Sequence, residues 1–187
     1  MPVITVALIE GYDEEFRRRL SQRLTDTARM FTGAAADGVT IVINEVDRGS
    51  YMRGRLNRTP GPPPTPPSEI ALSYLVAMEE RDLETARSFL AEDFAMTFPG
   101  GACFGSLDEL IAWSKDRYKS IKKTIEGTQE VPEEEAAVVY CRGTLAGEWL
   151  DGSPFSGIRF IDRFTVRDGK LADQQVWNDL AEAQAKR

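Results

Sequence analysis

The sequence predicts two α+β domains joined by a stiff spacer, and three observations support this. Six of the ten prolines fall within residues 60–67. Before them, an apolar run, an amphipathic helical segment and a second apolar run follow one another. After them, helical segments come first and alternating strands follow, which is typical of α+β folds. We therefore expect a first domain over residues 1–58, a linker over 59–67 and a second domain over 68–187.

The spacer has the sequence NRTPGPPPTPP. Such a stretch favours polyproline II, with about 3.1 Å per residue, so its eight central residues would span roughly 25 Å. A linker between two patterned segments is the preferred interpretation. A proline-rich ligand for a partner protein is the alternative.

The first domain reads as strand, helix, strand. Pro2–Ile9 is a β-branched run that Gly11 ends, and Val39–Val46 is a second apolar run. Asp13 can cap the helix between them, whose apolar face is formed by Phe16, Leu20, Leu24, Ala28 and Phe31. This pattern predicts a βαβ unit with parallel strands. Fewer than about 60 residues bury little core, so we expect a homo-oligomer.

The second domain is expected to begin with two short helices, over residues 68–78 and 83–90. A strand through Phe98 follows, and Ser106 can cap a third helix that reaches Trp113 and Tyr118. Strands are expected over residues 136–146, 156–167 and 171–177. The order predicts a curved antiparallel sheet folded over helices.

Composition excludes several kinds of function. A net charge of −7 and a pI near 4.8 argue against nucleic acid or an anionic membrane as a partner. No apolar run is long enough to cross a bilayer and no signal segment is evident, so a cytoplasmic location is expected. The chain has no histidine, and Cys103 and Cys141 form no spaced cluster. We expect no metal and no cofactor, and acid–base chemistry must come from other groups.

Pro2 has two interpretations. Proline lacks a backbone N–H and is tolerated at the first residue of a strand. If Met1 is removed, however, Pro2 carries a free secondary amine that can act as a base.

The residues around Pro2 favour the chemical interpretation. Pro2, Ile9-Glu10-Gly11, the amphipathic helix and Asn44-Glu45-Val46, with Gly49 and Tyr51 beyond, resemble the 4-oxalocrotonate tautomerase family over residues 2–56. The resemblance implies that Pro2 shuttles a proton between carbon and oxygen of an enol. It also implies that neighbouring protomers complete each site.

The segment also departs from that family. Tyr12 and Thr40 stand where the namesake has arginines that grip substrate carboxylates, so a dicarboxylate substrate is not expected. Tyr51 keeps the aromatic residue that makes the pocket apolar, which would lower the pKa of the Pro2 amine. Arg53 can supply replacement positive charge or be part of a solvated tail. The alternative for the whole domain is a degenerate tautomerase kept as an assembly platform.

Residues 69–179 resemble the SnoaL-like polyketide cyclases, ketosteroid isomerases and nuclear transport factor 2 relatives. The resemblance implies a cone-shaped α+β barrel and specifies activity poorly. The matching segments are residues 74–78, 82–83, 89–94, 99–101, 160–164 and 168–171.

Two positions match functional residues of ketosteroid isomerase: Tyr74 the oxyanion tyrosine, and Asp162 the acid that donates the second hydrogen bond. In RFIDRF, Asp162 shares one strand face with Phe160 and Phe164. Loss of solvation there raises the pKa of a carboxyl group and lets the neutral acid donate. Alternatively, Asp162 pairs with Arg142 or another cation.

The base of that isomerase is absent, because Phe98 occupies its position. On the last strand, Gln175, Val176 and Trp177 stand where SnoaL-like cyclases use an aspartate. An aromatic cavity remains, with candidate ligand contacts at Phe98, Trp113, Tyr118, Arg142, Gln175 and Trp177.

The preferred hypothesis is a cofactor-independent isomerase, tautomerase or cyclase acting on an unsaturated, polyketide-like carbonyl compound. Pro2 would move the proton in one site, while Tyr74 and Asp162 would polarise a carbonyl in the other. One alternative is a protein that binds a hydrophobic small molecule, with the first domain only driving oligomerisation. Another is a single active site in the cone with Asp162 as base.

Overall fold

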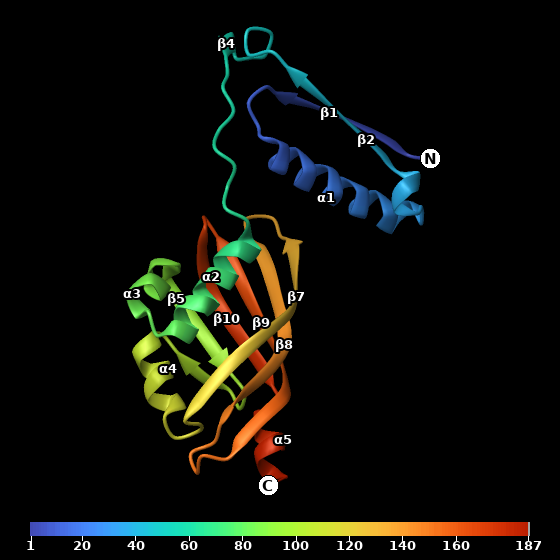
Figure 1. The fold of residues 1–187 in the computed structure, drawn as a ribbon. Helices are drawn as coiled ribbons and strands as arrows, with labels where there is room; N and C mark the ends of the chain where they lie inside the picture. The colour runs from blue at the N-terminus through green and yellow to red at the C-terminus, as the bar shows by residue number, and fades with distance from the viewer. Residues whose placement is uncertain (187) are drawn as a thin grey trace. The chain divides into compact units, whose positions relative to one another are not determined.

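The structure is a computed structural model that describes residues 1–186. The chain divides into two compact units, Met1–Pro64 and Thr65–Arg187. Figure 1 shows the elements of each unit. No helix among residues 1–186 is long and apolar enough to cross a membrane.

The first unit contains the predicted βαβ arrangement. Strands β1 (Val3–Ile9) and β2 (Thr40–Val46) pair in parallel, with Val3 opposite Thr40 and Ile9 opposite Val46. Between them lie α1 (Glu14–Thr32) and a 3₁₀ turn, η1 (Ala36–Gly38). The side chain of Asp13 caps α1 by accepting from the Phe16 amide at 2.8 Å. A short hairpin of β3 (Met52–Arg53) and β4 (Leu56–Asn57) follows.

The core of the first unit is small. Ile9, with 7% of its surface exposed, is the one buried hydrophobic residue of this unit. Phe31, predicted to lie on the apolar face of the helix, is 86% exposed. The reason is length: nineteen helical residues extend about 28 Å, whereas a seven-residue strand extends about 23 Å. The last turn of α1 therefore has no strand to cover it.

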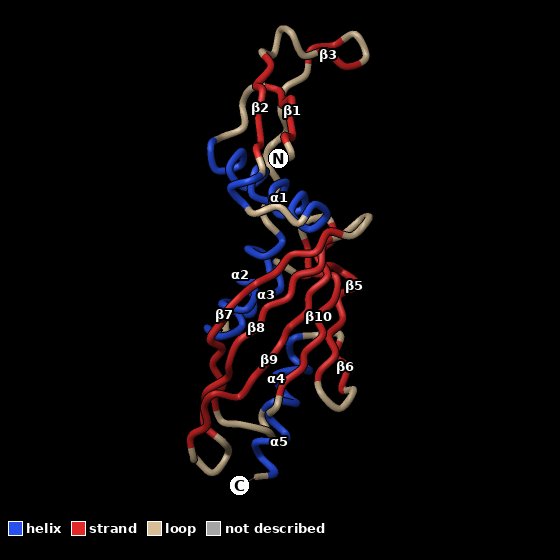
Figure 2. The backbone as a smooth tube through the Cα atoms, turned by 90° about the vertical axis from the view of Figure 1, so that its right-hand side faces the viewer, coloured by secondary structure: helices blue, strands red, loops and turns tan. Residues whose placement is uncertain are grey.

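The second unit is a curved sheet with helices on one face (Figure 2). Its elements are α2 (Pro67–Glu80), α3 (Leu83–Ser88), β5 (Leu90–Phe98), β6 (Ala102–Phe104), α4 (Leu107–Ser114), β7 (Ser120–Pro132), β8 (Ala137–Glu148), β9 (Pro154–Arg167), β10 (Lys170–Asn178) and α5 (Leu180–Ala185). The sheet order is β6-β5-β10-β9-β8-β7. All neighbouring strands are antiparallel except β5 and β10, which are parallel.

This unit differs from the sequence expectation in three respects. The predicted sheet is antiparallel throughout, whereas β5 and β10 pair in parallel. The helix α4 ends at Ser114, so Tyr118 lies in the turn that follows it. Residues 120–132, which the pattern left unassigned, form the long edge strand β7. β7 is solvated on one face, and the polar residue Lys123 at an inward position interrupts the apolar alternation that would have marked the strand.

Candidate active site

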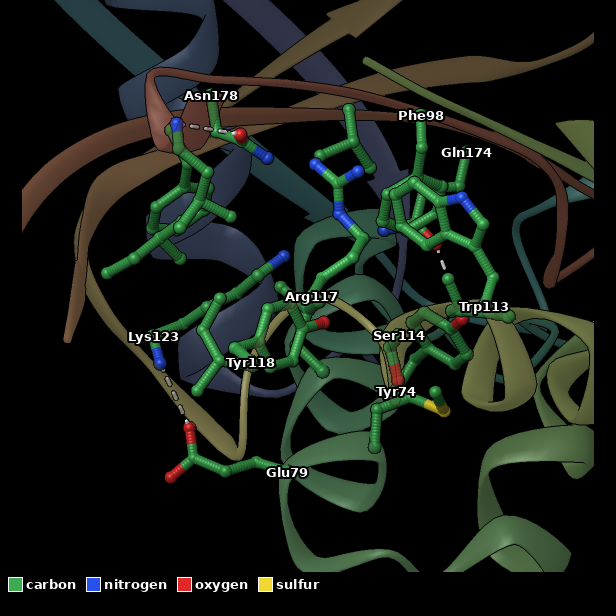
Figure 3. Close-up of a pocket in the computed structure, with 18 of the residues that line it drawn as sticks. Tyr74, Glu79, Phe98, Trp113, Ser114, Arg117, Tyr118, Lys123, Gln174 and Asn178 are labelled. Atoms are coloured by element: carbon green, nitrogen blue, oxygen red, sulfur yellow. Dashed lines mark hydrogen bonds between the residues drawn. The ribbon is translucent and has the colours of Figure 1, made fainter. Parts of the chain in front are cut away.

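The second unit contains a cavity of about 130 Å³ that is partly open to solvent. It lies between two clusters of buried side chains, one beneath α2 around Tyr74 and Phe164, and one near α5 around Leu145 and Phe160. Figure 3 shows the side chains that line it. A cavity of about 150 Å³ holds one benzene molecule, so this one accommodates roughly one ring of a ligand.

Tyr74 is fixed at the cavity wall by α2. It is 1% exposed, and its ring packs edge-on against Phe94 and Phe164. Its hydroxyl donates to Oε1 of Gln174 at 3.3 Å (Figure 3). Burial raises the pKa of Tyr74 far above its ordinary value, and the negative charge of Asp162 adds to this effect. Tyr74 therefore stays a neutral hydrogen-bond donor.

Gln174 is a cavity residue that the sequence analysis missed, and the predicted Gln175 and Trp177 do not line the cavity. Trp177 is 51% exposed, on the other face of the sheet. The cause is a bulge in β10 between Leu171 and Asp173, because one extra residue reverses which side chains face inward from that point on. Within residues 1–186 the amide nitrogen of Gln174 donates to no protein group, so it is free for a ligand.

Asp162 lies on the predicted buried face of β9 and is 0% exposed. Its partner is Lys123, whose ammonium donates to Oδ2. The other oxygen, Oδ1, is buried without a partner among the described residues. Burial raises the pKa of the Asp162 carboxyl, and the charge and hydrogen bond of Lys123 oppose the rise.

Arg142 is not the cation that pairs with Asp162. On β8 it alternates with the buried Cys141, so it lies on the opposite face of the sheet, 4.0 Å from Glu126. Lys123, not Asp162, lines the cavity. The expectation that the Asp162 carboxyl itself faces the ligand is therefore replaced: the lysine ammonium lies at the cavity wall, and the aspartate holds it.

Lys123 was missed because β7 was missed. In residues 121–125, IKKTI, the positions Ile121, Lys123 and Ile125 are more buried than the residues between them. This alternation is the signal that would have placed Lys123 inside. Its ammonium also lies 4.7 Å from the centre of the Phe160 ring, a favourable cation–π distance.

The other end of the cavity is aromatic. The predicted contacts Phe98, Trp113 and Tyr118 all line it, and the rings of Phe98 and Trp113 pack edge-on at 5.5 Å. The guanidinium of Arg117 lies 4.2 Å from the centre of the Trp113 ring. Burial raises the pKa of Tyr118, and the Ser114 hydrogen bond and the nearby charges of Arg81 and Arg117 oppose the rise.

The stability of the protein should depend on pH through Asp162. Because its folded-state pKa lies above the ordinary 3.8, its stabilising contribution is complete below that value and is lost as pH rises through the folded pKa. We expect the unfolding free energy of the wild type, minus that of Asp162→Asn, to decrease from pH 4 upward. Urea unfolding of both proteins at several pH values measures this. A difference that stays constant or increases would contradict it.

Pro2 lies directly before β1 in the first unit. It is partly buried, and its carbonyl accepts from the Thr40 amide at 3.0 Å, so the structure brings these two predicted residues together. Tyr12, Tyr51 and Arg53 follow the other ends of β1 and β2. Seven strand residues extend about 23 Å. A single chain therefore does not bring these three side chains to Pro2.

Among residues 1–186, no group of three or more Cys, Asp or Glu side chains is placed to hold a metal ion. The polar groups at the cavity include several donors, namely phenols, amides and cations, and a carboxylate, Glu79, which pairs with Lys122. Such donors suit the oxygen of a carbonyl or an enolate.

Comparison with known families assigns both halves of the chain. Residues 71–174 match the family model described as SnoaL-like domain. The chain belongs to the SnoaL-like family. Residues 2–56 match the model described as tautomerase enzyme, so this SnoaL-like protein carries a tautomerase domain at its N-terminus.

Curated relatives match the first domain. A probable tautomerase of Bacillus cereus is 32% identical over 54 residues, which are 29% of this chain and 88% of the relative. A 2-hydroxymuconate tautomerase of Bacillus subtilis is 31% identical over 51 residues, 27% of this chain and 82% of the relative. Both predicted family resemblances are thus confirmed.

Solved structures match the second domain in fold. TerC, co-crystallised with polyporic acid, is 20% identical with a TM-score of 0.54, and the match covers 65% of this chain and 97% of TerC. An NTF2-like protein of Burkholderia thailandensis is 17% identical with a TM-score of 0.55, covering 66% and 98%. Together the two families support an enzyme of isomerase, tautomerase or cyclase kind.

Proposed function

We propose that this SnoaL-like protein is a cofactor-independent enzyme that moves protons between carbon and oxygen of an enolisable, hydrophobic carbonyl compound. The N-terminal domain supplies the amine of Pro2 as the proton carrier. In a separate site, the cavity of the second domain binds a carbonyl group and stabilises the negative charge that develops on its oxygen while water takes the proton from the adjacent carbon.

The observation that carries this proposal is the set of donors in an apolar cavity. The Tyr74 hydroxyl, the Gln174 amide and the Lys123 ammonium come from three different elements, α2, β10 and β7, and line one space. In a water-poor site such donors stabilise an oxyanion far more than in water, because no solvent reorganisation is needed as the charge forms. Asp162 keeps the ammonium in place from behind.

Benzoylacetone tests the cavity, since it is an aromatic diketone that exchanges its central protons through an enol. We expect the protein to accelerate deuterium exchange at that carbon, followed by NMR. Tyr74→Phe and Lys123→Met should each slow it about 100-fold, the typical effect of one lost oxyanion donor. Lys122→Met is the matched control, since Lys122 is 74% exposed on the other face of β7 and pairs with Glu79. Equal rates in all four proteins would refute the proposed role of the cavity.

The catalytic role of Pro2 requires a partner chain. Within one chain, Tyr12, Tyr51 and Arg53 lie at the far end of the sheet from Pro2, and the face of the sheet away from α1 is uncovered. On that face Val3 is 64% and Val42 39% exposed. We therefore include a homo-oligomer in the proposal, in which a neighbouring chain covers this face and brings an aromatic residue to Pro2.

A lysine in the centre of the uncovered face should break the assembly. Val42→Lys puts a charge where a neighbouring chain must pack. The free energy needed to remove the ammonium from water exceeds what burial of the lysine methylene groups contributes. We expect light scattering after gel filtration to find an oligomer for the wild type and a monomer, or a much weaker assembly, for Val42→Lys. Thr27→Lys, at an exposed position of α1, is the control and should assemble normally. A monomeric wild type would contradict the proposed oligomer.

One observation favours a second function, ligand binding without chemistry. The cavity has no uncommitted carboxylate base: Asp162 lies behind Lys123, and Glu79 accepts from the Lys123 backbone amide at 3.2 Å. The benzoylacetone assay separates the two functions. A binding protein would take up the diketone without accelerating its exchange.

A further inference from the structure

The aromatic end of the cavity contains positive charge that no carboxylate neutralises. Among residues 1–186, neither Arg81 nor Arg117 has a carboxylate oxygen within ion-pair distance, although both contribute to the cavity wall. Lys123 differs, because Asp162 neutralises it. Glu79, the acidic residue of the wall, lies 3.4 Å from Lys122. The unbalanced charge is therefore on the arginines.

Arg117 is held so that its guanidinium faces the cavity. Its backbone N–H donates to the Ser114 carbonyl at 3.1 Å in the turn after α4, and its guanidinium stacks on Trp113. The stacking fixes the plane of the guanidinium group and leaves the N–H donors along the edge of that group free to point away from the indole ring. Figure 3 shows Arg117 and Lys123 reaching into the same space from different sides.

The surroundings of Arg117 suit a planar organic anion. Trp113 and Phe98 provide flat apolar walls, and Tyr118 adds a phenol within the field of Arg81 and Arg117. An arginine fork binds a carboxylate or an acidic enolate through two parallel hydrogen bonds. The volume of the cavity, about 130 Å³, limits the enclosed part of the ligand to roughly one ring.

We infer that the ligand of this cavity is a conjugated organic acid, bound as its anion, whose negative group pairs with Arg117 while its conjugated body lies against Trp113 and Phe98. This inference rests on the proposed function only in placing the reacting carbonyl at Tyr74, Gln174 and Lys123. It adds a charge preference, so that a neutral diketone or ester is still bound at the cavity but more weakly than an anion of similar shape.

Cinnamate and cinnamamide form the test pair, because they share shape and conjugation and differ in charge. Isothermal titration of the full-length protein should find cinnamate bound at least about tenfold more tightly than cinnamamide, the factor expected for one partly buried charged hydrogen bond. Arg117→Met should remove this preference by weakening cinnamate about tenfold, with cinnamamide little changed. Lys122→Met should keep it within twofold. Arg117→Gln repeats the measurement with a polar residue of similar length.

Equal affinities of the wild type for the two compounds, no detectable cinnamate binding at millimolar concentration, or a preference that survives both Arg117 variants would overturn the inference. Cinnamate has no enolisable carbon, so its binding is independent of catalysis. A wild type that binds cinnamate and cinnamamide equally while it accelerates benzoylacetone exchange would reject the anion and retain the proposed function. A charge preference that depends on Arg117, together with no acceleration of benzoylacetone exchange, would reject the proposed function and retain the anion.

Discussion

Pro2→Ala is expected to lower the rate of phenylpyruvate tautomerisation by at least about 100-fold. After removal of Met1, alanine at this position still offers an N-terminal amine. That amine is primary, however, and it lacks the proline ring that fixes its orientation at the start of β1. General acid–base catalysis by a positioned group contributes 100-fold to 10,000-fold, so the loss should lie in this range. The measurement follows enol absorbance with the full-length protein.

Two controls accompany this prediction. Intact mass shows whether Met1 is removed, since a retained Met1 blocks the amine of Pro2 and contradicts its role. Lys122→Met should keep the phenylpyruvate activity within twofold, because Lys122 is 74% exposed and belongs to the other unit. Tautomerisation that survives the loss of Pro2 would make the catalytic assignment of the first domain wrong.

Gly143→Ala is expected to unfold the second domain or to destabilise it by about 3 kcal/mol or more. A side chain at Gly143 would overlap the backbone carbonyl oxygen of Thr124 on β7, and a backbone atom cannot move aside as a flexible side chain can. A side chain at Gly147, further along β8 on the same face, would overlap the carbonyl oxygen of Ser120 in the same way. These glycines let β8 approach β7 where the sheet curves, so β7 can bring Lys123 to the cavity.

Gly105→Ala is the matched control. A side chain there meets no atom within 4 Å, and the residue has no left-handed backbone angle. Thermal unfolding should give nearly the wild-type midpoint for Gly105→Ala and a midpoint at least 10 °C lower for Gly143→Ala, by the order-of-magnitude conversion of roughly 4 °C per kcal/mol. A near-wild-type midpoint for Gly143→Ala would show that β7 is not held as described.

The sequence predicted most elements because local signals agreed with the fold. Asp13 marked the start of α1, and the RFIDRF alternation placed Asp162 on the buried face of β9. Both depend on residues close in the chain, where periodicity and capping chemistry decide the outcome.

The remaining parts of the candidate site depend on long-range structure. Lys123 is inside only because Asp162, thirty-nine residues away, neutralises it. Gln174 replaces Gln175 at the cavity because a bulge in β10 shifts the pairing with both neighbouring strands. The alternation of residues 121–125 marks an inward face, but it does not show that a charged side chain has a partner there. The bulge in β10 has no local signature.

The most direct test of the central claim compares the wild type with the Pro2→Ala/Lys123→Met double variant in one NMR experiment. The measured quantity is the rate of deuterium exchange at the enolisable carbons of phenylpyruvate and benzoylacetone. We predict that the wild type accelerates both and that the double variant, still folded by circular dichroism, returns both to the rate in buffer. Acceleration by the double variant equal to that of the wild type would show that the amine of Pro2 and the ammonium of Lys123 do not carry the chemistry.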